Sequence, residues 1–145
     1  MNVPKIFFNS PLVKTVQKIV DAHGSWSGMT VPEGLPEACA RMASKSFAQQ
    51  HPIIKTILLV LSKTKAGIYF TDAKGNVKQW LYKHECYHWE RAEAPDMGGE
   101  KYFWLLVAQY IIYGHDKAPE EVAANNYGKS GSDTPEEQAW FDASN

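Results

Sequence analysis

Residues 84–88 read His-Glu-Cys-Tyr-His, an HExxH pattern inside a stretch rich in helix formers. Side chains four residues apart lie on the same face of a helix, so His84 and His88 can both direct an imidazole nitrogen at one metal ion. Imidazole nitrogens suit zinc. Glu85 is turned from His84 by about one hundred degrees, which places its carboxylate beside the ion rather than on it. The pattern therefore predicts a zinc site in which Glu85 acts as general base toward water.

A helix without any metal is the competing interpretation of the same five residues. In that case both histidines would face solvent and Glu85 would form surface ion pairs. Cys86 and Tyr87 weigh against it, because residues of this kind between the histidines are typical of a helix that contacts a core. Cys86 points away from the histidine face, so we interpret it as a small buried side chain and not as a ligand.

This motif, on a helix expected to follow β-strands, resembles that of the zincin metallopeptidases over about residues 67–128. The resemblance implies an antiparallel sheet whose edge strand holds an extended peptide, with the motif helix beneath it. The metzincin branch has Gly three and His six residues after the second histidine. Arg91 and Ala94 occupy those positions here, which excludes that branch.

The gluzincin branch takes its third ligand from a glutamate on a later helix. The resemblance therefore points to Glu121 in a predicted helix at residues 119–127. Asn125 follows one turn later, and resembles the acid or amide that orients this ligand in thermolysin-like enzymes. Asn replaces the more usual Asp, and the spacing from His88 is longer than in thermolysin. Three other residues remain candidates for the third position: Glu120, His115 and Asp116.

Substrate contacts are expected from residues around the motif. His115 is assigned a catalytic role as a donor to the oxyanion that forms when water attacks a carbonyl. Tyr113 and Tyr127 are alternatives for this role, although core or rim packing explains both. Trp80, placed on a predicted strand just before the motif helix, is the tryptophan expected to touch substrate.

The elements that must position these residues are predicted from periodicity and turn signals. Helices are expected at residues 12–20, 36–50, 81–94, 99–113 and 119–127, and after a capping box at Thr134. Residues 25–35 are expected to form a loop. Residues 54–62, 67–71 and 77–81 predict an antiparallel meander of two or three strands, although residues 54–62 also fit a buried helix.

Length and composition set the outer limits. A chain of 145 residues with 44% hydrophobic residues predicts one α+β domain over residues 1–145, of minimal zincin-like build. The formal net charge of -1 and the lack of a basic stripe argue against nucleic-acid binding. No apolar run is long enough to span a membrane. With no secretory signal sequence evident, we expect a cytoplasmic protein, or one exported without a classical signal, with Cys39 and Cys86 reduced.

The sequence thus predicts a zinc-dependent metallopeptidase or related amide hydrolase acting on a peptide or cell-wall peptide. The alternative is a binding or assembly protein with a structural or degenerate metal site. The apolar helix at residues 99–113 favours that alternative, since it could form a homodimer interface or contact another protein.

Overall fold

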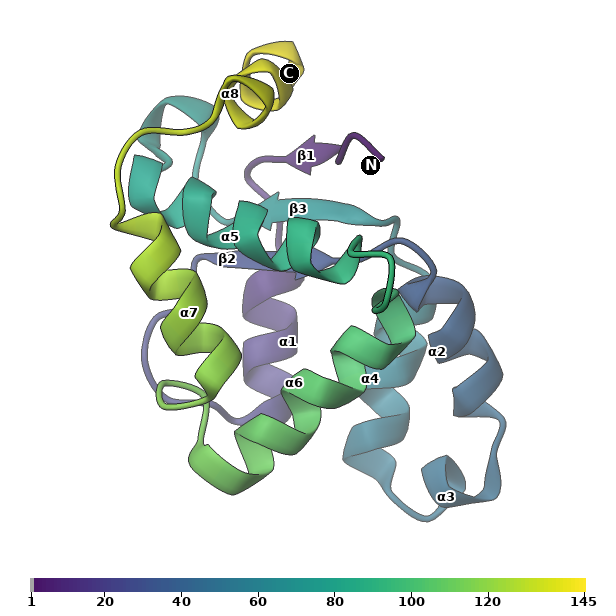
Figure 1. The fold of residues 1–145 in the computed structure, drawn as a ribbon. Helices are drawn as coiled ribbons and strands as arrows, with labels where there is room; N and C mark the ends of the chain where they lie inside the picture. The colour runs from purple at the N-terminus through teal and green to yellow at the C-terminus, as the bar shows by residue number, and fades with distance from the viewer. Residues whose placement is uncertain (1) are drawn as a thin grey trace.

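The computed structural model describes residues 2–145, which fold into an α+β arrangement of eight helices and one small sheet (Figure 1). The strands are β1 (Ile6–Phe7), β2 (Gly28–Val31) and β3 (Gly67–Phe70). Their spatial order is β1-β3-β2, with β1 parallel and β2 antiparallel to β3. The sheet is therefore mixed, β3 is its buried centre, and β2 is an edge strand.

Four helices precede the central strand: α1 (Leu12–Val20), α2 (Leu35–Ala43), α3 (Ser46–Gln49) and α4 (Pro52–Ser62). Four helices follow it: α5 (Gln79–Ala92), α6 (Gly99–Tyr113), α7 (Pro119–Gly128) and α8 (Pro135–Ala143), with a short 3-10 turn, η1 (Lys74–Asn76), before α5. Figure 1 shows α5 running along the sheet, with α7 and α6 converging on it from below. The motif helix is thus surrounded by the sheet and two later helices.

The sheet separates two hydrophobic clusters, because side chains alternate along β3. Tyr69 packs into a cluster built by α1, α2 and α4. Ile68 and Phe70 face the other way, into a cluster with Tyr82 and Cys86 of α5 and residues of α8. Cys86 is fully buried there, and both cysteines are free thiols, as the sequence predicted. The motif helix therefore has an apolar face toward the sheet and directs its histidines elsewhere.

The predicted antiparallel meander is wrong. Residues 54–62 belong to helix α4, which begins at Pro52 and buries Leu58 and Leu61, three residues apart, on one face. Residues 77–81 contain no strand, since α5 begins at Gln79. Only the prediction for residues 67–71 gives a strand, β3.

The two remaining strands come from segments far away in the sequence. β1 is two residues long, and β2 lies inside residues 25–35, which we expected to be a loop. The helix predicted at residues 36–50 is divided into α2 and α3. Trp80 lies in the first turn of α5 rather than on a strand, and it is exposed. The capping box at Thr134 is present as predicted and begins α8.

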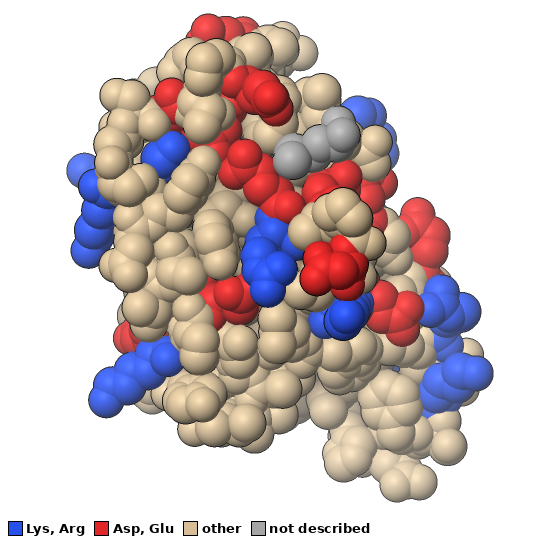
Figure 2. All heavy atoms as spheres, in the orientation of Figure 1, with Lys and Arg blue, Asp and Glu red and all other residues tan. Residues whose placement is uncertain are grey.

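The apolar helix predicted from the sequence is α6, and its C-terminal end is open to solvent. Ile111 and Ile112 are 79% and 71% exposed. Figure 2 shows acidic and basic side chains interspersed over much of the visible face, whereas the lower part over α6 is mostly uncharged. No helix within residues 2–145 has both the length and the apolar character needed to cross a bilayer.

Candidate metal centre

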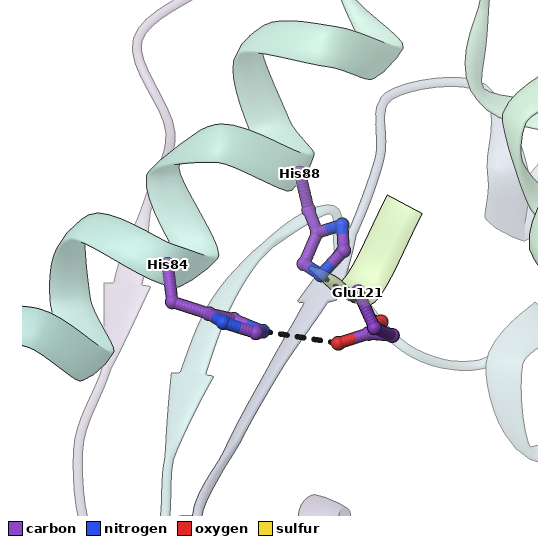
Figure 3. A group of neighbouring side chains, drawn as sticks. All are labelled: His84, His88 and Glu121. Atoms are coloured by element: carbon purple, nitrogen blue, oxygen red, sulfur yellow. Dashed lines mark ion pairs between the residues drawn. The ribbon is translucent and has the colours of Figure 1, made fainter. Parts of the chain in front are cut away.

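His84 and His88 lie one turn apart on the same face of α5, and Glu121 reaches them from the first turn of α7 (Figure 3). Nε2 of His84 is 3.1 Å from Oε1 of Glu121, and Nε2 of His88 is 3.1 Å from Oε2. One ligand atom from each residue lies within 4.8 Å of the others, so a single ion can bind all three. The side chains are nearly enclosed, with residue exposures of 8% for His84, 5% for His88 and 4% for Glu121.

Charge in this enclosed group is concentrated on Glu121. Burial alone would raise its pKa, but hydrogen bonds with His84, His88 and Tyr110 outweigh burial and hold the pKa well below its ordinary value. The hydroxyl of Tyr110 donates to Oε2 at 2.6 Å. Burial alone would lower the pKa of His84, yet the carboxylates of Glu121 and Glu85 raise it. The buried negative charge of Glu121 is therefore stabilised by the hydrogen-bond donors around it, and a metal cation can take over that role.

A hydrogen bond at Nδ1, the ring nitrogen that does not face Glu121, would fix the orientation of each histidine ring. Nδ1 of His88 lies 2.7 Å from the hydroxyl of Tyr102. When Nε2 binds a metal, Nδ1 carries the ring proton, and the hydroxyl oxygen can accept a hydrogen bond from it. Nδ1 of His84 is buried and has no hydrogen-bond partner within residues 2–145. Asn125 lies near enough to this ring to contribute to its raised pKa. Two imidazole nitrogens and one carboxylate form the donor set of a three-ligand zinc site, so these residues fit zinc.

Glu85 lies beside the three ligands and is itself 4% exposed. Its Oε2 is 3.8 Å from Nε2 of His84. The hydroxyl of Thr30, on edge strand β2, lies 2.9 Å from Oε1 and 3.1 Å from the Glu85 carbonyl. A Cβ atom at Gly28 would come within 3.0 Å of Oε2, so glycine leaves the space that the carboxylate occupies. Strand β2 therefore fixes Glu85 next to the ligands without making it one of them.

The predicted catalytic residue His115 also lies at this group. It is on the connection between α6 and α7, and its Nε2 is 3.8 Å from Oε1 of Glu121. Its ring stacks on Trp26, with centroids 5.0 Å apart and an interplanar angle of 27°. On another side it contacts the ring of Tyr110, at 5.2 Å between centroids. The structure thus places a second imidazole donor close to the ligands but outside the three-residue group.

The other candidates for the third ligand are engaged elsewhere. Both oxygens of Glu120 are occupied, by Nε of Arg91 at 2.9 Å and by the hydroxyl of Tyr87 at 3.1 Å. Asp116 is almost fully exposed and accepts from Nδ1 of His115 at 3.1 Å. Neither belongs to the group formed by the histidines and Glu121.

The two tyrosines proposed as oxyanion donors have other surroundings. Tyr113 is exposed at the end of α6, and the hydroxyl of Tyr127 donates to Glu137 at 2.7 Å. Sequence reasoning missed Thr30, Tyr102 and Tyr110. Tyr102 and Tyr110 did have a sequence signal, because they are eight residues apart and so lie on one face of an apolar helix. In the structure their hydroxyls contact two of the ligands, His88 and Glu121. Thr30 had no such signal, because its strand looked like a loop.

The residues brought together can support hydrolysis. Three protein ligands leave a coordination position for water, and the carboxylate beside them can accept its proton. Comparisons with protein-family models, curated protein sequences and solved structures return no match. A function is therefore inferred from the chemistry of these side chains.

Proposed function

We propose that this protein is a zinc-dependent hydrolase of peptide or related amide bonds. In this proposal His84, His88 and Glu121 bind zinc and Glu85 is the general base. The observation that carries it is the meeting of Glu121 with the two motif histidines at 3.1 Å from each. Glu121 is the only one of the two adjacent glutamates whose oxygens lie at these histidines, since Glu120 pairs with Arg91 and Tyr87. The arrangement is the one expected from the gluzincin resemblance.

When bound, zinc supplies the Lewis acidity that lowers the pKa of water and polarises a carbonyl. Glu85 accepts the proton of the attacking water and passes it to the leaving amine. Thr30 fixes the carboxylate for this transfer. The imidazolium form of His115 carries both ring protons, so it can donate one from Nε2 to the oxyanion and the other from Nδ1 to Asp116, which holds the ring.

An extended peptide is the substrate that the surroundings favour. β2 is the edge of the sheet, and two of its residues contact Glu85. A peptide that paired with this edge would lie alongside the general base. Cell-wall peptides present the same amide bonds, and both belong to the proposed substrate class.

Metal content and hydrolysis test the proposal together. Protein purified without a histidine tag should contain zinc, and His88→Ala should lose most of it. Glu85→Gln should retain zinc but no longer hydrolyse a mixed peptide library, with the cleavage products measured by mass spectrometry. Glu93, a half-buried glutamate just beyond α5, accepts from the Asn2 amide and contacts none of the site residues. Glu93→Gln is the matched control and should behave like the parent. A parent without zinc, or zinc retained equally by His88→Ala, would overturn the proposal.

The alternative is a binding or assembly protein in which the same metal site is structural. The observation that favours it is the burial of all four site residues, together with the exposed apolar end of α6. Structural zinc sites are closed, whereas catalytic ones keep an open position. Zinc in the parent combined with hydrolysis that Glu85→Gln leaves unchanged would select this alternative.

A further inference from the structure

Gly128 ends helix α7 without the backbone conformation that usually places glycine at a helix end. That conformation is left-handed, and glycine adopts it more easily than other residues. Gly128 is instead the last helical residue of α7, and Lys129 after it has a φ of -93°, which is also outside the left-handed region. Glycine is a poor helix former, so the local backbone does not favour it here. The reason for this glycine therefore lies in its surroundings.

The surroundings of Gly128 are the backbone and side chains of α5. Figure 1 shows this end of α7 beside the first half of α5. A Cβ atom at Gly128 would lie 2.5 Å from the carbonyl oxygen of Trp80 and 3.4 Å from Cβ of His84. Ordinary van der Waals contact begins at 3.4 Å, so the distance to Trp80 is short by 3.4 − 2.5 = 0.9 Å. The carbonyl belongs to the first turn of α5 and moves only with that helix. Glycine is thus what allows the two helices to approach this closely.

The same face of α7 carries Glu121, the proposed third ligand. Gly128, Ala124 and Glu121 are four and three residues apart, which is the spacing of one helix face. Ala124 is fully buried, and Glu121 reaches His84 and His88 at 3.1 Å each. His84 is therefore contacted twice by α7, at its backbone and Cβ by Gly128 and at its ring by Glu121 (Figure 3). The helix spacing at Gly128 is also the spacing across which the carboxylate meets the imidazoles.

A zinc ion tolerates little error in this spacing. It binds imidazole nitrogen at about 2.0–2.1 Å and carboxylate oxygen at about 2.0–2.2 Å, and deviations stay within about 0.2 Å. An alanine at position 128 would push the end of α7 away from α5 to relieve its contact with Trp80. Because α7 is one continuous helix of ten residues, this displacement tilts the turn that carries Glu121 as well. Ligands spaced more widely fit a larger ion better.

We propose that Gly128 determines the size of the ion that the candidate metal centre selects, by holding α7 against α5 at the spacing that zinc requires. The inference rests on the proposed function in taking His84, His88 and Glu121 as metal ligands. Gly128 is a positioning residue, since it acts on the ion only through His84 and Glu121.

Binding of Zn²⁺ and Cd²⁺ tests this role, because Cd²⁺ has the same charge and a filled d shell but is larger. Chelator competition on the metal-free protein gives both affinities. Gly128→Ala should weaken zinc binding about tenfold to a hundredfold, the range for losing a group that orients a ligand. Cadmium binding should weaken less than about threefold, because longer metal–ligand bonds match the wider spacing. A loss of stability alone would lower both affinities by the same factor.

Two other glycines provide matched controls. A Cβ atom at Gly67, in the central strand, would lie 2.5 Å from the carbonyl oxygen of Lys5, the same clash in a place that contacts no ligand. Gly67→Ala should lower the midpoint of urea denaturation and leave the ratio of the two affinities unchanged. A Cβ atom at Gly75 would meet no atom within 4 Å in the described part of the chain. Gly75→Ala should therefore match the parent in every measurement.

An unchanged ratio of the two affinities in Gly128→Ala would overturn the role of Gly128 and leave the zinc site as proposed. If this variant does not fold, the preference of the parent decides. A parent that binds zinc more tightly than cadmium supports the inference, and one that prefers cadmium overturns it, since its spacing would already suit the larger ion. A parent that binds neither ion would overturn the proposed function together with this role.

Discussion

Glu121 is a buried carboxylate whose charge is tolerated because three donors converge on it. His84 and His88 each lie 3.1 Å from one oxygen, and Tyr110 donates to Oε2. A cation placed between these groups would take over the role of these hydrogen-bond donors in stabilising the carboxylate charge. The adjacent residue, Glu120, has the same chemistry but is bound to Arg91. This pair of neighbours allows the ligand assignment to be tested residue against residue.

Glu121→Gln should weaken zinc binding by at least about a hundredfold, because the change removes the charged ligand while keeping its volume. Competition with a chelator of known affinity measures the effect. Glu120→Gln is the control and should leave zinc affinity unchanged, since that carboxylate pairs with Arg91 and Tyr87. Equal losses in the two variants, or a larger loss for Glu120→Gln, would show that the third ligand is wrongly assigned.

Thr30 holds Glu85, the general base of the proposed hydrolase, through a hydrogen bond of 2.9 Å. Thr30→Val keeps the shape of the side chain and removes its hydrogen bond to Glu85. We expect zinc content to stay at the parent level and peptide hydrolysis to fall about tenfold. Thr30→Ser restores the hydroxyl and should recover most of the rate. Loss of zinc in Thr30→Val, or a serine variant as slow as the valine variant, would contradict this role.

At the scale of elements, α8 is fastened to the motif helix by a buried ion pair. Nζ of Lys83 lies 3.2 Å from Oε1 of Glu137, and both side chains are almost fully buried. Glu137 also accepts from the hydroxyl of Tyr127 at 2.7 Å and from the Thr134 amide at 2.8 Å. The carboxylate of Glu137 thereby joins α5, α7 and the start of α8. Its partner on α5, Lys83, is the residue next to His84.

Glu137→Ala should lower the free energy of unfolding by about 3 kcal/mol, because it leaves Lys83 charged, buried and without its partner. Urea denaturation of the metal-free protein measures this change. Glu136→Ala removes the neighbouring glutamate in the same first turn and serves as the control, with an expected change below about 0.5 kcal/mol. A destabilisation as large in the control would show that the effect comes from the helix start and not from the ion pair.

The elements that could be predicted from the sequence are those with local signals. The capping box at Thr134 and the proline at the start of α7 both mark helix starts, and the two helices begin there. The sheet was not predictable in this way. β1 has two residues and β2 has four, and their pairing with β3 joins segments far apart in the chain. Residues 54–62 are rich in β-branched residues, but they form a helix because this conformation buries Leu58 and Leu61 on one face.

The same distinction applies to the site. The two histidines and Glu85 follow from a five-residue pattern, and Glu121 followed from a family resemblance. The structure brings all four together. The groups that orient them could not be predicted, because Thr30, Tyr102 and Tyr110 reach the site only through the packing of β2 and α6 around α5.

At the scale of the whole molecule, the charges of the metal group make stability depend on pH. The folded pKa of Glu121 is lowered from 4.5, so its contribution is complete above that value and is lost as pH falls further. The folded pKa of His84 is raised from 6.5, so its contribution is complete below that value and is lost as pH rises through the folded pKa. Together, Glu121 and His84 stabilise the folded, metal-free protein most between pH 4.5 and pH 6.5.

Zinc at the proposed site would reverse the upper part of this dependence. A zinc-bound imidazole nitrogen carries no proton, so binding competes with the protonation that the surroundings of His84 favour, and below the folded pKa of His84 the apparent affinity falls about tenfold per pH unit for that proton. We therefore expect zinc to raise Tm by a larger increment at pH 7.5 than at pH 5.5, with calorimetry of metal-free and zinc-loaded protein as the measurement. Glu121→Gln should show a smaller increment at both pH values. An increment that is equal at the two pH values in the parent would mean that zinc binds without displacing a proton from His84, and that the ion lies elsewhere in the molecule.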